Sequence, residues 1–139
     1  MNEKANTRLT FAILDMRKGF AKLPPSTEEE YPLPAWYRAV SETHLDELGL
    51  EDICKACRQQ VHLEHVVPLA LRILKKESLA GEMYDGELLV SLKSAPLDYW
   101  PAHQDEVSSL KLIIETVSRS ENTDDDLRRD VQELLARVG

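Results

Sequence analysis

The sequence lacks any hydrophobic run long enough to span a membrane. It also lacks the apolar core and the small-residue cleavage site of an N-terminal secretory signal. There are only two cysteines, Cys54 and Cys57, and in a chain without export signals these are expected to be reduced thiols. We therefore expect a cytoplasmic protein without disulfides and without a membrane partner. With 139 residues, 42% of them hydrophobic, it can bury a core without a structural metal.

Basic residues are scarce after the first 23 positions. Residues 1–23 carry five Lys and Arg against two acids, whereas residues 24–139 carry twelve against twenty-three, a net charge of −11. Such a field repels nucleic-acid phosphate and anionic lipid, and it speeds the encounter with basic partners. The charge therefore argues against direct binding of nucleic acid and in favour of a basic protein partner.

No strong segment alternates with the period of two that is typical of a half-buried strand, and apolar residues instead recur at helical spacing. The sequence predicts an all-α fold, in a single compact helical domain over residues 1–139 with about five to seven helices. Residues 1–23 should hold a first helix, with one apolar face made of Leu9, Ala12, Ile13, Met16 and Phe20. Residues 24–40 contain four prolines and predict a linker without regular structure up to about Pro34, packed on the body through Tyr31, Trp36 and Tyr37.

The segment 45–100 is predicted to form the helical core. Apolar spacing predicts a continuous helix from Leu50 to Glu64, and Pro68 is expected to end or bend it and to open the next, central helix. Asp85 is well placed to cap the following helix by accepting a backbone N–H.

Residues 104–139 are predicted to form a pair of helices. The first is defined by the apolar positions Val107, Leu110, Ile113, Ile114 and Val117. Thr123 and Asp126 have the spacing of an acidic capping box and predict the start of the second helix, which runs to the end of the sequence.

The stretch "CKACRQQVHLEH" (54–65) contains both cysteines and two of the four histidines, a combination typical of metal sites. On a continuous helix, residues 54 and 65 would lie roughly 16 Å apart along the axis, whereas zinc ligands lie about 2.0–2.3 Å from the ion. Cys54 and Cys57 also share the apolar stripe of Leu50 and Val61. The sequence therefore favours buried, structural thiols, with no metal and no cofactor.

Catalytic motifs are not evident. "GEMYDG" (81–86) has neither the spacing nor the Lys and Ser/Thr ending of a phosphate-binding loop, and a nucleophile elbow is missing. Glu82, Asp85 and Glu87 could be paired carboxylates for acid–base chemistry, but a solvated turn and a helix cap are the favoured interpretation. His44 and His103 lie in predicted loops without an evident partner. We expect a protein that is not an enzyme, with no catalytic residues.

The run from Leu45 to Trp100 resembles a family of bacterial immunity proteins from contact-dependent growth inhibition systems. The resemblance rests on four features in order: an acidic "ED" opening a helix (Glu51, Asp52), an "RQ" pair (Arg58, Gln59), a helix-opening proline (Pro68) and the turn "YDGELL" (84–89). It implies a small α-helical protein that neutralises the toxic C-terminal domain of a delivered effector by binding it. The acidic body favours a basic nuclease as that toxin, held in a heterodimer.

The candidate toxin contacts are acids and aromatic residues in two loops and at the start of the next predicted helix. They are Glu82, Tyr84, Asp85, Glu87, Asp98, Tyr99, Trp100, Asp105 and Glu106. Asp124–Asp126 are equal candidates, because family motifs tend to preserve the fold while toxin recognition varies. The alternative hypothesis is an acidic helical adaptor or regulatory protein that binds a partner unrelated to toxins.

Overall fold

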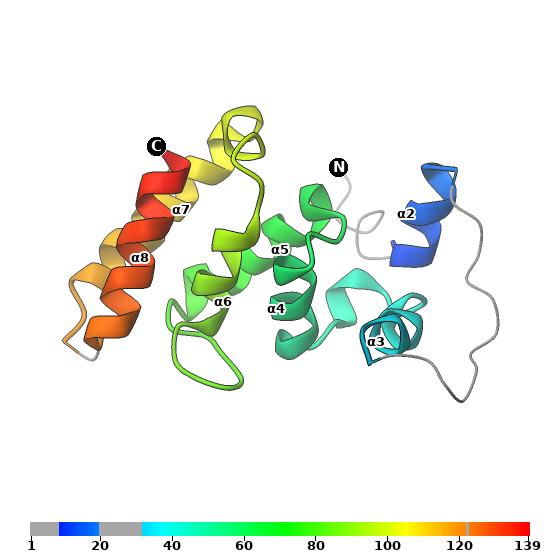
Figure 1. Ribbon diagram of the computed structural model, residues 1–139, viewed down its shortest axis with the longest axis horizontal. Helices are drawn as coiled ribbons and strands as arrows, with labels where there is room; N and C mark the ends of the chain where they lie inside the picture. Colours follow the sequence, from blue (N-terminus) through cyan, green and yellow to red (C-terminus); the bar gives the residue numbers. More distant parts are fainter. Residues whose placement is uncertain (1–8, 20–31, 122) are drawn as a thin grey trace. The chain divides into compact units, whose positions relative to one another are not determined.

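The computed structural model describes residues 9–19, 32–121 and 123–139, and within these ranges the regular secondary structure is entirely helical. The all-α prediction is therefore confirmed. The chain divides into two compact units, Met1–Gly49 and Leu50–Gly139, and each is described by itself (Figure 1). The assignment of residues 1–139 to a single domain stays a prediction.

The first unit contains α2 (Phe11–Arg17), α3 (Pro32–Val40) and the short 3₁₀ helix η1 (Leu45–Glu47). Helix α2 begins after Thr10, whose hydroxyl accepts a hydrogen bond of 3.1 Å from the Ile13 N–H. The Phe11 ring stacks on Tyr37 with centroids 5.6 Å apart, and the Tyr37 hydroxyl donates a hydrogen bond of 2.5 Å to Asp15. These contacts join α2 to α3.

The apolar face predicted for the first helix is right at Leu9, which is buried, and wrong at Ile13 and Met16. Ile13 and Met16 are exposed, whereas Leu9, Phe11 and Leu14 are buried. The reason is that α2 is only seven residues long and Leu9 precedes it, held by a 2.9 Å hydrogen bond between its carbonyl and the Leu45 N–H. Phe20 lies outside the described residues.

The prediction that residues up to about Pro34 lack regular structure is also wrong, because α3 begins at Pro32. Both Pro32 and Pro34 lie in its first turn, where the backbone N–H groups have no intrahelical partner and proline removes nothing. Trp36 and Tyr37 are partly buried in this helix. Tyr31 and the rest of residues 20–31 lie outside the described residues.

The second unit contains the helices α4 (Leu50–Arg58), α5 (Leu63–Lys76), α6 (Glu87–Ser91), α7 (Gln104–Ser118) and α8 (Asp125–Val138), with the 3₁₀ helices η2 (Leu92–Ser94) and η3 (Trp100–Ala102). Helix α5 packs against α4, α6 and α7, which confirms the prediction of a central helix. Helices α7 and α8 lie side by side, as Figure 1 shows, and all five predicted apolar positions of α7 are buried.

The helix predicted from Leu50 to Glu64 breaks after Arg58. Gln60 adopts a left-handed conformation (φ 57°), the Val61 N–H reaches back to the Ala56 carbonyl at 2.9 Å, and the Gln60 N–H reaches the Cys57 carbonyl at 3.2 Å. This hydrogen-bond pattern is a Schellman motif, and its left-handed position, here Gln60, is normally occupied by glycine. The Gln60 side chain fixes it by donating a 2.8 Å hydrogen bond to the Ser94 carbonyl.

Pro68 neither ends nor opens a helix, since it lies inside α5, which already begins at Leu63. Proline removes only one backbone hydrogen bond, to the carbonyl four residues earlier. That loss is offset because Leu63, Val66 and Val67 on the preceding turn are buried.

The predicted capping box before the last helix is wrong by one residue. The N-cap of α8 is Asp124, whose carboxylate accepts a 2.7 Å hydrogen bond from the Leu127 N–H. Thr123 is buried and donates instead to the Val117 carbonyl at 2.9 Å, which fastens the connection between α7 and α8.

Candidate functional site

The turn before α6 is held from inside by Glu87. Its side chain is buried, and one carboxylate oxygen accepts the backbone N–H groups of Glu82 and Met83 at 2.8 and 2.9 Å. The other oxygen lies 3.2 Å from Nη1 of Arg58 on α4. Burial raises the pKa of Glu87, but the two backbone hydrogen bonds and Arg58 together outweigh it and lower the pKa below its usual value. Glu87 is therefore a charged anchor of the turn, not a surface residue.

Two glycines make this turn possible. A Cβ on Gly81 would lie 2.0 Å from the Tyr84 carbonyl oxygen. Gly86 has φ +89°, and a Cβ there would lie 2.6 Å from Leu127 of α8. The turn is therefore pressed against α8 and needs both glycines.

The prediction that Asp85 caps α6 is wrong. The residue that precedes α6 is Gly86, α6 has no side-chain cap, and Asp85 is exposed. The buried carboxylate of Glu87 binds the turn's free N–H groups instead. Met83 and Tyr84 consequently point outward, with 79% and 51% of their surface exposed.

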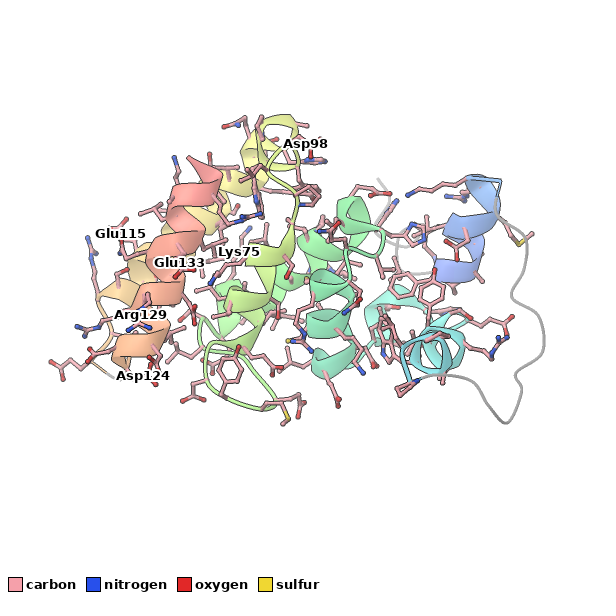
Figure 2. The ribbon with its side chains drawn as sticks, in the orientation of Figure 1. Lys75, Asp98, Glu115, Asp124, Arg129 and Glu133 are labelled. Atoms are coloured by element: carbon pink, nitrogen blue, oxygen red, sulfur yellow. The ribbon has the colours of Figure 1, made fainter. Side chains whose placement is uncertain are left out.

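A solvent-open cavity of about 420 Å³ lies between the turn and the start of α8. Its lining consists of Tyr84, Asp85, Asp124, Asp126, Leu127 and Asp130. Figure 2 shows Asp124 at the beginning of α8, with Arg129 and Glu133 further along the same helix. We call Met83 together with the cavity's tyrosine and four aspartates the acidic turn surface.

The charges on the acidic turn surface are only partly balanced. Asp130 accepts a 2.9 Å hydrogen bond from Lys93, which also binds Glu133, and Arg129 lies 3.8 Å from Asp126. Burial, followed by the charges of Glu87 and Asp130, raises the pKa of Tyr84. An exposed aromatic ring in a field of carboxylates suits a basic side chain of a partner, because the ring attracts cations through its face.

The structure thus brings Tyr84 and Asp85 together with Asp124 and Asp126, far along the sequence, while Glu82 is exposed beside them. Sequence reasoning did not identify Asp130 or Met83. Asp130 could have been found, since it follows Asp126 by four positions and so lies on the same face of a helix.

The second predicted loop is largely structural. Trp100 is fully buried, and Tyr99 is nearly so. The Tyr99 hydroxyl donates to Glu106 at 2.5 Å, its ring stacks on His103 with centroids 4.0 Å apart, and burial followed by Glu106 raises its pKa. Of the five candidates in this region, Asp98 and Asp105 are exposed and Glu106 is partly buried.

Cys54 and Cys57 are buried free thiols, as expected of packing residues. The separation expected along a continuous helix does not apply to this segment, because α4 ends before His62 and His65. Burial raises the pKa of the Cys54 thiol to about 11 and that of the Cys57 thiol to about 12. Among the residues described, the group with ligand atoms close enough to share a metal ion is His44, Asp46 and Glu47, all exposed.

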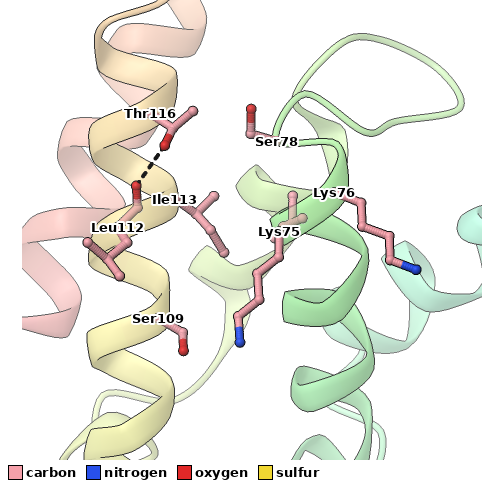
Figure 3. A pocket seen from close by; sticks show the side chains of 8 residues that line it. Lys75, Lys76, Ser78, Ser109, Leu112, Ile113 and Thr116 are labelled. Atoms are coloured by element: carbon pink, nitrogen blue, oxygen red, sulfur yellow. Dashed lines mark hydrogen bonds between the residues drawn. The ribbon is translucent and has the colours of Figure 1, made fainter.

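A second cavity of about 420 Å³ lies between α5 and α7, and its side chains are drawn in Figure 3. Leu74 and Ile113 are buried at its base, Leu112 is 67% exposed, and Lys75 and Lys76 stand on the α5 side. We call it the α5–α7 groove.

None of the helices that the structure describes combines the length and apolarity needed to cross a membrane. Fold and surface together define a small helical protein with an acidic surface beside the turn before α6. A family model described as CDI immunity proteins matches residues 20–110, more than half of the sequence. The chain therefore belongs to the CDI immunity proteins, and the recognition made from the sequence is confirmed. A comparison with curated proteins finds no match.

Two of the sequence features on which the resemblance rests meet in the structure. Arg58 of the "RQ" pair and Glu87 of the "YDGELL" turn form one ion pair, and the "ED" residues Glu51 and Asp52 occupy the first turn of α4. Arg58 and Glu87 anchor the turn before α6. Membership of this family implies binding of a cognate toxin.

Proposed function

We propose that this chain neutralises one cognate toxin domain by direct binding, in a one-to-one complex, with the acidic turn surface at the centre of the contact. The observation that carries the proposal is the convergence of exposed Tyr84 with Asp85, Asp124, Asp126 and Asp130 around one open cavity. Tyrosine is one of the residue types that most often form the energetic centre of a protein–protein interface.

We further propose that the toxin is a nuclease with a basic substrate groove, and that both partners meet in the cytoplasm. A groove that holds phosphate needs Lys and Arg, and a chain with a net charge of −8 attracts it at long range. Bound there, the carboxylates of the acidic turn surface occupy the positions of phosphates and exclude the nucleic acid. The chain acts without catalysis, by occupying the groove.

The test is co-expression with the toxic domain encoded immediately upstream of this gene, followed by growth assays and purification of the complex. We expect survival, a one-to-one complex, and competition between this protein and a nucleic-acid oligonucleotide for the toxin. Death despite soluble expression would reject neutralisation. Survival with a complex that still binds the oligonucleotide would reject occupation of the substrate groove.

A further inference from the structure

The α5–α7 groove combines an apolar base with an exposed leucine. Leu74 and Ile113 close the base, and Leu112 presents 67% of its surface to solvent at the rim. Ser109 lines the same α7 wall, and the hydroxyl of Thr116 is turned back to the Leu112 carbonyl at 3.0 Å (Figure 3). The α7 wall of the groove is therefore uncharged, and its most prominent group is apolar.

The α5 side of the groove is basic. Lys75 and Lys76 are exposed, and within the described part of the chain neither has a carboxylate in ion-pair range. By contrast, Lys93 is held by two carboxylates at 2.9 and 2.6 Å. The place of Lys75 and Lys76 in the last turn of α5 stabilises the helix dipole, but that role does not require an apolar groove beside them.

The groove lies close to the acidic turn surface along the chain. Ser78 lines the groove, and the turn starts only four residues later at Glu82. Four residues span at most about 14 Å, so a single partner that covers the usual 800 Å² or so on this protein can reach both surfaces.

We propose that the α5–α7 groove is a second contact for the same cognate toxin domain. It takes a segment of the toxin that places an apolar side chain against Leu112 and Ile113 and a carboxylate beside Lys75, whose ammonium group extends toward the α7 side, whereas that of Lys76 points away from α7 (Figure 3). The acidic turn surface repels such a segment, so the two neighbouring surfaces of opposite sign fix the orientation in which the toxin binds. This inference rests on the proposed function and adds the chemistry of a second part of the toxin.

Two variants test the groove: the double charge reversal Lys75→Glu with Lys76→Glu, and Leu112→Ser. The matched control reverses Arg17 and Lys18, which are also adjacent and exposed at the end of a helix but line neither the groove nor the acidic turn surface. Affinity for the purified toxin domain is measured by titration calorimetry, and circular dichroism melting checks that each variant is folded. We expect both groove variants to bind at least tenfold more weakly, and the control to bind as tightly as the wild type or more tightly.

Wild-type affinity in both groove variants would overturn the inference, and if Tyr84 and Asp85 variants still lost affinity, the proposed function would stand. A wild-type chain that self-associates, and that Leu112→Ser makes monomeric without loss of toxin affinity, would identify a second copy as the occupant and also overturn it. A wild-type chain that fails to bind the toxin would reject the proposed function and the inference together.

Discussion

A guanidinium nitrogen of Arg58 lies 3.2 Å from a carboxylate oxygen of Glu87, and this ion pair links the end of α4 to the turn before α6. Glu87 is buried, whereas the Arg58 side chain is 38% exposed. The same Glu87 binds two backbone N–H groups of the turn. One buried carboxylate therefore sets the shape of the segment that carries Met83 and Tyr84.

Replacing Glu87 by Gln should lower the free energy of unfolding by about 1–3 kcal/mol at pH 7, because hydrogen bonds to a charged group are lost. The folded-state pKa of Glu87 lies below its usual value, so its contribution is present above the unfolded pKa of about 4.3 and is lost as the pH falls through the folded pKa. The difference in the free energy of unfolding between wild type and variant should thus disappear at acidic pH. Urea unfolding between pH 7 and pH 3 measures it, with the exposed Glu77→Gln as control; a difference that stays constant would contradict the assignment.

Gly86→Ala should destabilise the protein by about 2–4 kcal/mol, because the left-handed backbone is strained by a side chain and the new methyl group overlaps Leu127. Gly19 has the same φ of +89°, but no atom of the described residues lies within 4 Å of the place a methyl group would take, so Gly19→Ala reports the backbone strain. Chemical denaturation of both variants separates the two effects. Equal losses would show that the contact with α8 is unimportant.

Asp85→Asn should leave the free energy of unfolding within about 0.5 kcal/mol of wild type, since Asp85 is exposed and caps no helix. It should slow association with the toxin, and the effect should shrink as salt rises, because the screening length at 0.15 M is about 8 Å. Stopped-flow association at several salt concentrations tests this. A large loss of stability would restore a capping role.

Tyr84→Ala should mainly speed dissociation of the toxin complex, by about tenfold or more, because truncating a central aromatic residue removes short-range contacts. Tyr84→Phe, which keeps the ring, serves as the matched variant. Surface plasmon resonance gives both rates. Unchanged dissociation for Tyr84→Ala would place the centre of the contact elsewhere.

The thiols of Cys54 and Cys57 should react slowly with iodoacetamide at pH 8 in the native protein, since both are buried and their pKa values of about 11 and 12 leave few thiolates. In denaturant both should be alkylated at the rate of free cysteine. Mass spectrometry over time follows the reaction. Rapid native labelling of either thiol would show that the core between α4 and its neighbours opens readily.

Helices α7 and α8 could be predicted from sequence because their apolar residues recur at regular spacing and all five predicted α7 positions are buried. The break after α4 could not, because Gln60 takes a conformation that normally signals glycine, and its side chain finds its partner in a distant segment, at Ser94. The anchor of the turn is hidden from sequence for a similar reason. A local rule points to Asp85 as the cap, whereas the actual anchor, Glu87, depends on Arg58 29 positions away.

The candidate site could be predicted in its residue types but not in its geometry. Tyr84, Asp85, Asp124 and Asp126 were all candidates, yet only the packing of the turn on α8 through Gly86 brings them to one cavity. Trp100 was a candidate for the same chemical reasons and is fully buried. Sequence alone does not distinguish an aromatic residue that anchors a partner from one that fills the core.

The separation of anchoring residues from exposed residues in the turn before α6 bears on how new toxin specificities arise. Glu87 is buried, Gly86 packs against α8 and Arg58 pairs with Glu87, whereas the side chains of Met83, Tyr84 and Asp85 are exposed. Substitutions at these three positions should therefore leave the fold intact. When the sequence of the toxin changes, a few substitutions at three adjacent codons can adapt the immunity protein to it. For protein engineering, the same three positions can be randomised in a library while the fold is kept unchanged.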